Sequence, residues 1–269
     1  MKQKIKGLFF DAGGVLLTMD FNVLSEHLHH FAGETSHYKK YQHFFPESSD
    51  FEIAEQISRP LLDDFLQDES SEKASTRLQF MIYIWEEAWK SKRSKIAKGT
   101  KLVAENKVNA FETPLPTSEL FKQWAKANEK YHNNNNLWQR IIPGTKKALA
   151  AIQSLGITMA VVSNADGRVA DILDKAGLAK YFALIIDSHI VGVEKPDPEI
   201  FNIALKKLEL KSEETLYLGD FYSIDVVGSR KAGLTPVLMD PLKIWKKSDV
   251  LRIQSLSEYP ELIAKLIRE

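Results

Sequence analysis

The chain has 269 residues, of which 44% are hydrophobic and 10% aromatic, so it can bury one substantial core or two moderate ones. Lys and Arg together number 36 and so do Asp and Glu, and this balance disfavours nucleic acid or an acidic membrane surface as a partner. The absence of Cys excludes disulfides, thiolate metal sites and a cysteine nucleophile. No stretch has the pattern of a signal peptide or a membrane span, so we expect a cytoplasmic protein with no membrane partner.

The first predicted element is a buried strand at residues 5–10, followed directly by Asp11. A short apolar run of this kind suits a parallel strand, and open α/β sheets place their ligand sites at the carboxyl ends of such strands. Gly13 and Gly14 lack Cβ atoms, so they permit a sharp turn and a close approach of backbone N–H groups to an anion. Taken alone, the same residues also fit an ordinary turn after a core strand.

The next region, from Thr18 to Leu137, is rich in helix formers. Apolar residues recur three and four positions apart in segments 61–67 and 75–90, which predicts an all-helical domain inserted after the first strand. The polar run at 133–136 stands just before the chain returns to the first domain, and it predicts a hinge or an exposed turn.

Strands and helices are predicted in alternation after Pro143-Gly144, which is typical of a parallel sheet flanked by helices. The predicted strands are 158–162, 184–186, 216–218 and 236–239, and the predicted helices are 167–175, 197–208 and 224–232. The first strand has the same composition and is assigned to the same sheet. The expected domains are therefore an α/β core of residues 1–17 and 138–269 and a helical domain of residues 18–137.

Three further segments of the α/β part place polar side chains where phosphate or metal binding is expected. Ser163 ends a predicted strand before a helix, so its hydroxyl and the helix N-terminal amides are expected to face an anion. Lys195 precedes a helix that begins with two prolines, which would fix the position of one positive charge. Asp220 ends another strand and Asp225 follows it in the chain, and carboxylates at a strand end suit a hard cation such as Mg²⁺. Alone, each segment also fits a structural role as an N-cap, a surface lysine or a turn.

Taken together and in this order, Asp11, Ser163, Lys195 and the pair Asp220 and Asp225 resemble the haloacid dehalogenase superfamily of hydrolases, most of which are phosphatases. The resemblance covers residues 1–17 and 138–269, and segment 228–234 is similar to the family's pattern after the acidic motif. It implies a Rossmann-like doubly wound parallel sheet core with an inserted all-helical cap domain of the family's first type.

The resemblance also implies a function, namely Mg²⁺-dependent hydrolysis of a small phosphorylated metabolite through an aspartyl phosphate on Asp11. Ser163 and Lys195 are the other catalytic residues that it implies. The implied phosphate-binding residues are Ala12, Gly13, Ser163, Asn164 and Lys195, and the implied Mg²⁺ ligands are Asp11, the Gly13 carbonyl, Asp220 and Asp225. Backbone N–H groups of residues 12–14 are expected to complete the phosphate cradle.

Position 13 departs from the family's commonest pattern, in which a second Asp two residues after the nucleophile protonates the leaving group. Gly13 keeps a backbone carbonyl for the metal but removes acid–base help that is typically worth ~10²–10⁴-fold in rate. Three interpretations stay open. The substrates have good leaving groups, as anomeric or aryl phosphates do; a cap His or a carboxylate such as Asp20 or Asp166 replaces the acid; or the chain is a weakly active or inactive relative that binds phosphorylated ligands.

A further alternative within the family is a 2-haloacid dehalogenase, which also lacks the second Asp and uses the same nucleophile on carbon without a metal. The acidic pair Asp220 and Asp225 opposes this alternative, because two carboxylates of the metal-binding type contribute nothing to the displacement of a halide.

Overall fold

The computed structural model describes residues 5–34, 45–66, 74–98, 118–246 and 249–268. Contacts divide the chain into two units, one with Met1–Thr18, Asp63–Lys73 and Trp138–Glu269, and the other with Met19–Leu62 and Ala74–Leu137. No helix within the described ranges is both long enough and apolar enough to cross a membrane.

A six-stranded parallel sheet lies at the centre of the first unit, in the order β5-β4-β1-β6-β7-β8. Its strands are β1 (Gly7–Phe10), β4 (Thr158–Ser163), β5 (Leu184–Asp187), β6 (Thr215–Gly219), β7 (Thr235–Met239) and β8 (Leu251–Ile253). The predicted parallel α/β core is therefore confirmed. Sequence reasoning missed β8, because this short strand at the sheet edge contains Arg252 and an exposed Leu251 and shows no apolar run.

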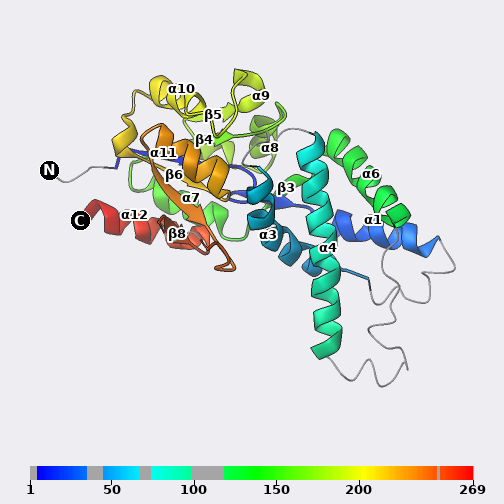
Figure 1. Ribbon diagram of the computed structural model, residues 1–269. Coiled ribbons are helices and arrows are strands. Elements are labelled where there is room, and N and C mark those ends of the chain that lie inside the picture. The colour runs from blue at the N-terminus through cyan, green and yellow to red at the C-terminus, as the bar shows by residue number, and fades with distance from the viewer. Residues whose placement is uncertain (1–4, 35–44, 67–73, 99–117, 247–248, 269) are drawn as a thin grey trace. The chain divides into compact units, whose positions relative to one another are not determined.

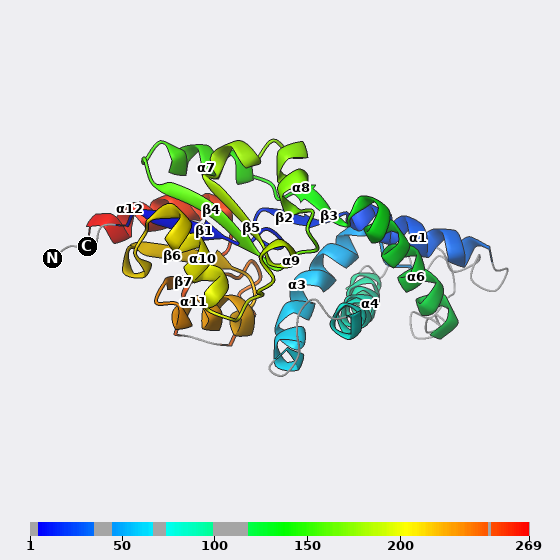
Figure 2. The same ribbon diagram turned by 90° about the horizontal axis from the view of Figure 1, so that it is seen from above.

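Side chains of the sheet alternate between two buried faces, as the pleat of a strand requires. Leu8 and Phe10 pack with α7 (Thr145–Gln153), α8 (Val169–Lys175) and α12 (Tyr259–Arg268) on one face. Phe9 and Tyr217 pack with α10 (Glu199–Leu208) on the other face. Figure 2 shows α7 and α10 on opposite sides of the sheet. Because β1 is buried on both faces, the residue that follows it is held at a fixed place.

The helices predicted for this unit are confirmed, with differences at their starts. α8 and α10 begin two residues later than predicted, because the preceding residues form turns in which Asp187 accepts the Gly167 N–H and Asp197 accepts the Glu199 N–H. The helix predicted at 224–232 begins as the π-helix η4 (Tyr222–Val226) and continues as α11 (Val227–Lys231). Single π-helical turns of this kind are frequent at functional sites.

The described part of the second unit is helical, as predicted. It contains α1 (Phe21–Gly33), α3 (Ser48–Phe65) up to Leu62, α4 (Ala74–Lys98) and α6 (Ser118–Asn135) (Figure 1). Aromatic side chains form its core: the ring centroids of Trp85 and Trp124 lie 4.9 Å apart, and those of Phe51 and Trp124 lie 5.6 Å apart. All three of these rings are buried, so this cluster stabilises the unit by packing.

Of the two predictions for the polar run at 133–136, the exposed turn is wrong, since three of its residues complete α6, and the hinge stays a prediction. Asn136 is buried and ends the helix with φ 63°, a left-handed conformation that Asn tolerates better than most residues.

A two-stranded sheet follows, formed by β2 (Leu17–Met19) and β3 (Trp138–Ile141). The Asp20 N–H donates to Leu137 O at 2.8 Å and the Ile142 N–H donates to Leu16 O at 3.1 Å, so the two strands are antiparallel. The two segments that join the units therefore pair with each other.

Candidate active site

The carboxyl ends of three neighbouring strands bring the predicted site residues together. Phe10 of β1 is level with Val161 of β4 and Leu218 of β6. Asp11 extends this pairing by one residue, since its N–H donates to Leu218 O at 2.9 Å. Asp11, Ser163 and Asp220 therefore emerge at the same end of the sheet, although they are far apart in the sequence.

Lys195 lies within this group, and its side chain is only 1% exposed. Its Nζ lies 3.0 Å from Oδ2 of Asp11 and 2.8 Å from Oδ1 of Asp225. Burial by itself lowers the pKa of Lys195, but the two carboxylates outweigh burial and raise that pKa, so the ammonium group stays charged. The surface-lysine alternative is therefore wrong.

Asn164 holds the main chain of Lys195 from the loop after β4. Its Oδ1 accepts the Lys195 N–H at 2.7 Å, and its Nδ2 donates to Lys195 O at 2.9 Å. The sequence prediction makes Asn164 a phosphate-binding residue, whereas both polar atoms of this side chain are engaged with Lys195. A second support comes from Gly228, where a Cβ atom would lie 2.9 Å from Cα of Pro196. Asn164 and Gly228 thus fix where the charge of Lys195 stands.

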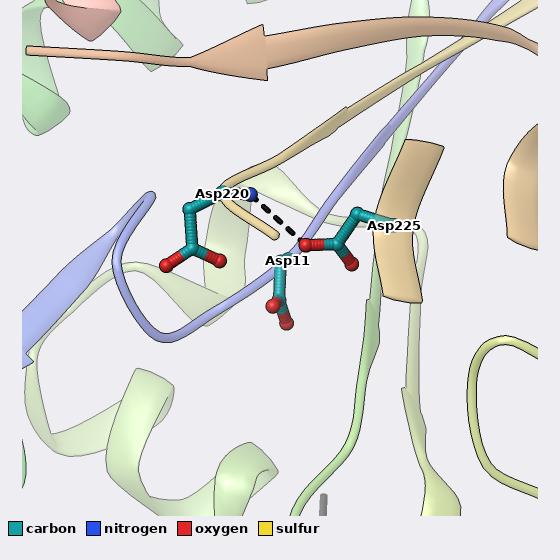
Figure 3. Close-up of side chains that lie close together, drawn as sticks. All are labelled: Asp11, Asp220 and Asp225. Atoms are coloured by element: carbon teal, nitrogen blue, oxygen red, sulfur yellow. Dashed lines mark hydrogen bonds between the residues drawn. The ribbon is translucent and has the colours of Figure 1, made fainter. Parts of the chain in front are cut away.

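The carboxylates of Asp11, Asp220 and Asp225 lie close together (Figure 3). One oxygen of each lies within 4.8 Å of the others, and within the described ranges no other group of His, Cys, Asp or Glu has this geometry. Asp220 and Asp225 are buried, and the Asp11 side chain is 13% exposed. A cluster of oxygen donors that remains open on one side fits a hard divalent cation.

Asp225 also shapes the turn that follows β6. Its Oδ2 accepts the N–H groups of Asp220 and Phe221, both at 2.9 Å, as the dashed line in Figure 3 shows for Asp220. Its Oδ1 accepts hydrogen bonds from Lys195 Nζ at 2.8 Å and from Tyr217 Oη at 3.0 Å. A Cβ atom on Gly219 would collide with the Asp225 side chain, so only glycine permits this close approach. Asp225 therefore positions Asp220 and Lys195 together.

Sequence reasoning missed Tyr217, which lies in the middle of β6 and is fully buried. Its Oη accepts a hydrogen bond from Lys195 Nζ at 2.8 Å and lies 3.0 Å from Val162 O. Burial raises the pKa of Tyr217 well above its ordinary value, and the negative charge of Asp225 raises it further, so the phenol stays protonated. The sequence offered one signal for this role: Tyr217 places a polar hydroxyl between Leu216 and Leu218, in the middle of a predicted apolar strand.

Asp11 itself is in a mixed electrostatic environment. Burial raises the pKa of its carboxyl group, while the charge of Lys195 and a hydrogen bond from Ser163 lower it. The Ala12 N–H donates to Oδ1 of Asp11 at 2.7 Å. Gly14 adopts φ 69° and its N–H binds Leu17 O at 2.7 Å, so the prediction that the N–H groups of residues 12–14 all face a phosphate is wrong for Gly14.

Ser163 is buried at the end of β4, but the amides of the loop that follows it do not face an anion as predicted. Oδ1 of Asp187 accepts the Gly167 N–H at 3.1 Å, and Oδ2 accepts the Val169 N–H at 3.3 Å. Asp187 is the register partner of Ser163 on β5. Its carboxylate therefore takes the place of the expected anion and fixes the loop that carries Asn164.

The two carboxylates considered as substitutes for the missing acid have other surroundings. Asp166 is exposed, and Nε of Arg168 lies 3.1 Å from both of its oxygens. Asp20 belongs to the second unit, directly before α1. Asp166 thus has an ion-pair partner of its own, and replacement of the acid by either residue stays a prediction.

Comparison with known proteins agrees with this geometry. Residues 5–233 match the family model of haloacid dehalogenase-like hydrolases. Haloacid dehalogenase-like hydrolase domain-containing protein 3 of Bos taurus is 31% identical over 140 residues, which are 51% of this chain and 55% of that protein. Glyceraldehyde 3-phosphate phosphatase of Pyrococcus abyssi is 31% identical over 110 residues, which are 40% of this chain and 45% of that protein.

The chain thus spans about half the length of the curated relatives it matches. The similarity to a solved structure is longer. The HAD-hydrolase YfnB of Bacillus subtilis, in a crystal form bound to magnesium, aligns over 97% of this chain and 99% of its own, with a TM-score of 0.56 and 17% identity. This likeness concerns the fold.

Proposed function

Because the chain belongs to the haloacid dehalogenase-like hydrolases, we propose that it is a Mg²⁺-dependent phosphomonoester hydrolase with Asp11 as its nucleophile. One observation carries the proposal: the buried ammonium of Lys195 contacts the Asp11 carboxylate inside a cluster of three carboxylates. Burying charged groups costs free energy of folding, and replacing such groups by apolar residues is often neutral or stabilising. Their convergence at the carboxyl ends of the strands therefore supports a functional role.

The donor set fits Mg²⁺, which prefers carboxylate and carbonyl oxygens. Three carboxylates against the one ammonium of Lys195 leave two negative charges among these four side chains, which a divalent cation would neutralise. We assign Asp11, Asp220 and the Gly13 carbonyl as ligands, with Asp225 beside them holding Asp220 and Lys195 in place. When bound, Mg²⁺ supplies charge neutralisation between the nucleophile and the phosphoryl oxygens.

In the proposed reaction an oxygen of Asp11 attacks phosphorus, and the bond from phosphorus to the leaving-group oxygen breaks. The ammonium of Lys195, the Ser163 hydroxyl and the Gly13 N–H group bind the phosphoryl oxygens during this step, while the Ala12 N–H, which donates to Oδ1 of Asp11, orients the attacking carboxylate. Water then attacks the phosphorus of the aspartyl phosphate, which releases inorganic phosphate and restores the Asp11 carboxylate. One water is consumed, and its protons end on the leaving group and on phosphate or solvent.

The leaving group decides which substrates react, because no carboxyl group stands at position 13 to protonate it. We therefore propose small phosphorylated metabolites whose leaving group is stable as an anion, as in anomeric or aryl phosphates. The phosphatase name of the Pyrococcus abyssi relative supports the general substrate class. We also propose that residues 18–137 form the cap domain that selects among such substrates.

The test is phosphate release from a panel of phosphorylated metabolites, with wild type and Asp11→Asn each assayed in Mg²⁺ and in chelator. We expect release by wild type in Mg²⁺ only, and a loss of at least ~10³-fold in Asp11→Asn, because the variant cannot form the covalent intermediate. Asp174→Asn is a matched control, since Asp174 is exposed on α8 and does not belong to the carboxylate cluster. Phosphate release that ignored chelator would contradict the proposed mechanism.

The alternatives give different results in the same assay. Halide release from 2-chloropropionate without phosphate release would indicate a dehalogenase. Binding of inorganic phosphate without turnover of any phosphoester would indicate the inactive relative that binds phosphorylated ligands.

A further inference from the structure

The space beside Gly13 is filled by Trp138. A Cβ atom built on Gly13 would lie 3.3 Å from Cε3 and 3.4 Å from Cζ3 of the Trp138 indole. Both residues belong to the first unit, and Trp138 is the first residue of β3. The six-membered ring of the indole therefore lies tightly against the place where the Cβ of any side chain at position 13 would stand.

Trp138 is also held in place. It begins a strand that pairs with β2, and hydrogen bonds flank this pairing at Leu137 O and at the Ile142 N–H. The side chain is half-buried, so part of it remains accessible. Trp138 thus presents a partly exposed aromatic ring from a hydrogen-bonded strand, next to the loop that follows Asp11. Such a ring has the properties of a binding surface.

This inference rests on the proposed function, in which position 13 lies on the leaving-group side of Asp11. We propose that Trp138 is a specificity-determining residue that contacts the leaving group, and that the substrates are phosphomonoesters of aromatic alcohols.

Two physical arguments favour an aromatic leaving group. An aryl oxide leaves as a stabilised anion and so has least need of the acid that Gly13 lacks. An aromatic ring also packs favourably against an indole, whereas a sugar or glycerol hydroxyl placed against it would lose hydrogen bonds to water without replacement. Gly13 therefore selects for a leaving group that is stable as an anion, and Trp138 selects for one that is aromatic.

A binding experiment tests the role of Trp138 without turnover. Calorimetric titration in Mg²⁺ compares phenylphosphonate with methylphosphonate for wild type, Trp138→Phe and Trp138→Leu. We expect wild type to bind phenylphosphonate about tenfold more tightly, Trp138→Phe to keep most of this preference, and Trp138→Leu to lose it. An equal affinity of wild type for the two phosphonates, no binding of phenylphosphonate, or a preference that survives Trp138→Leu would overturn the inference.

A kinetic experiment separates substrate contact from a merely structural role. We expect Trp138→Leu to lower kcat/KM for 4-nitrophenyl phosphate by about five- to tenfold and to leave acetyl phosphate, whose leaving group is good but not aromatic, within about twofold. An equal loss on both substrates would overturn the role in specificity. If wild type bound phenylphosphonate selectively through Trp138 but released phosphate from neither substrate, the proposed hydrolase function would fail while the aromatic contact stood.

Discussion

Gly13 and Trp138 form a matched pair of residues, because the indole fills the space that a side chain at position 13 needs. The absence of the family's second Asp is therefore more than one changed residue. Restoring the acid alone would force the ring or the nucleophile loop to move.

We predict that Gly13→Asp destabilises the protein by about 1–3 kcal/mol through overpacking against Trp138. In a Trp138→Ala background the same substitution should cost less, by about 0.5 kcal/mol or more, since the neighbour is gone. Urea unfolding of the wild type, both single variants and the double variant measures this coupling free energy. Additive effects in the cycle would show that the two positions do not compete for space.

Asp187 acts at the scale of an element, since one carboxylate at the end of β5 organises the whole loop between β4 and α8. It accepts N–H groups from Gly167 at 3.1 Å, Val169 at 3.3 Å and His189 at 3.0 Å. The loop carries Asn164, and Asn164 holds Lys195. The position of the Lys195 charge thus depends on Asp187, with which the Lys195 ammonium forms no hydrogen bond or ion pair.

Replacing Asp187 by Ala should leave these three N–H groups, of which that of Val169 is buried, without their acceptor and lower the free energy of unfolding by about 3 kcal/mol. We also expect phosphate release to fall, because the Asn164 loop loses its anchor. Asp197→Ala is the matched control, because Asp197 is exposed and accepts the single Glu199 N–H at 2.9 Å, so we expect a loss of about 1 kcal/mol. Equal losses in the two variants, measured by urea unfolding, would contradict this role of Asp187.

At the scale of the whole molecule, the buried carboxylate cluster affects the free energy of unfolding. Burial raises the pKa of Asp11, so the ionised carboxylate opposes folding when no cation is bound. Relative to the unfolded chain, Asp11 adds stability at acidic pH, and this contribution is lost as the pH rises through the raised pKa of the folded state.

We therefore predict that Asp11→Asn, in chelator at neutral pH, increases the free energy of unfolding by about 1 kcal/mol, because Asn carries no charge to bury. The difference from wild type should shrink as the pH falls below the raised pKa and Asp11 gains a proton. Mg²⁺ should stabilise wild type more than the variant, since the variant lacks one ligand. Thermal unfolding across pH, with and without Mg²⁺, measures both the gain in stability of the variant and the stabilisation of each protein by Mg²⁺. An Asp11→Asn variant less stable than wild type in chelator at neutral pH would contradict the argument.

Much of this protein is readable from the chain alone. The apolar runs that end in Asp11, Ser163 and Asp220 predict buried parallel strands, and the alternation with helices predicts the α/β core, because period and burial are local properties of the sequence. Since parallel strands align their carboxyl ends, even the convergence of these residues follows from the pattern.

Tertiary packing decided what each polar group is bonded to. The Asp187 carboxylate accepts the hydrogen bonds of amides that were expected to bind an anion. Asn164 binds the main chain of Lys195, and Tyr217 bonds to both Lys195 and Asp225. Each of these contacts joins residues that are not neighbours in the sequence. Trp138 stands beside Gly13 for the same reason. Hydrogen bonds and van der Waals contacts depend on distances of a few ångströms, and spacing along a sequence does not contain those distances until the chain has folded.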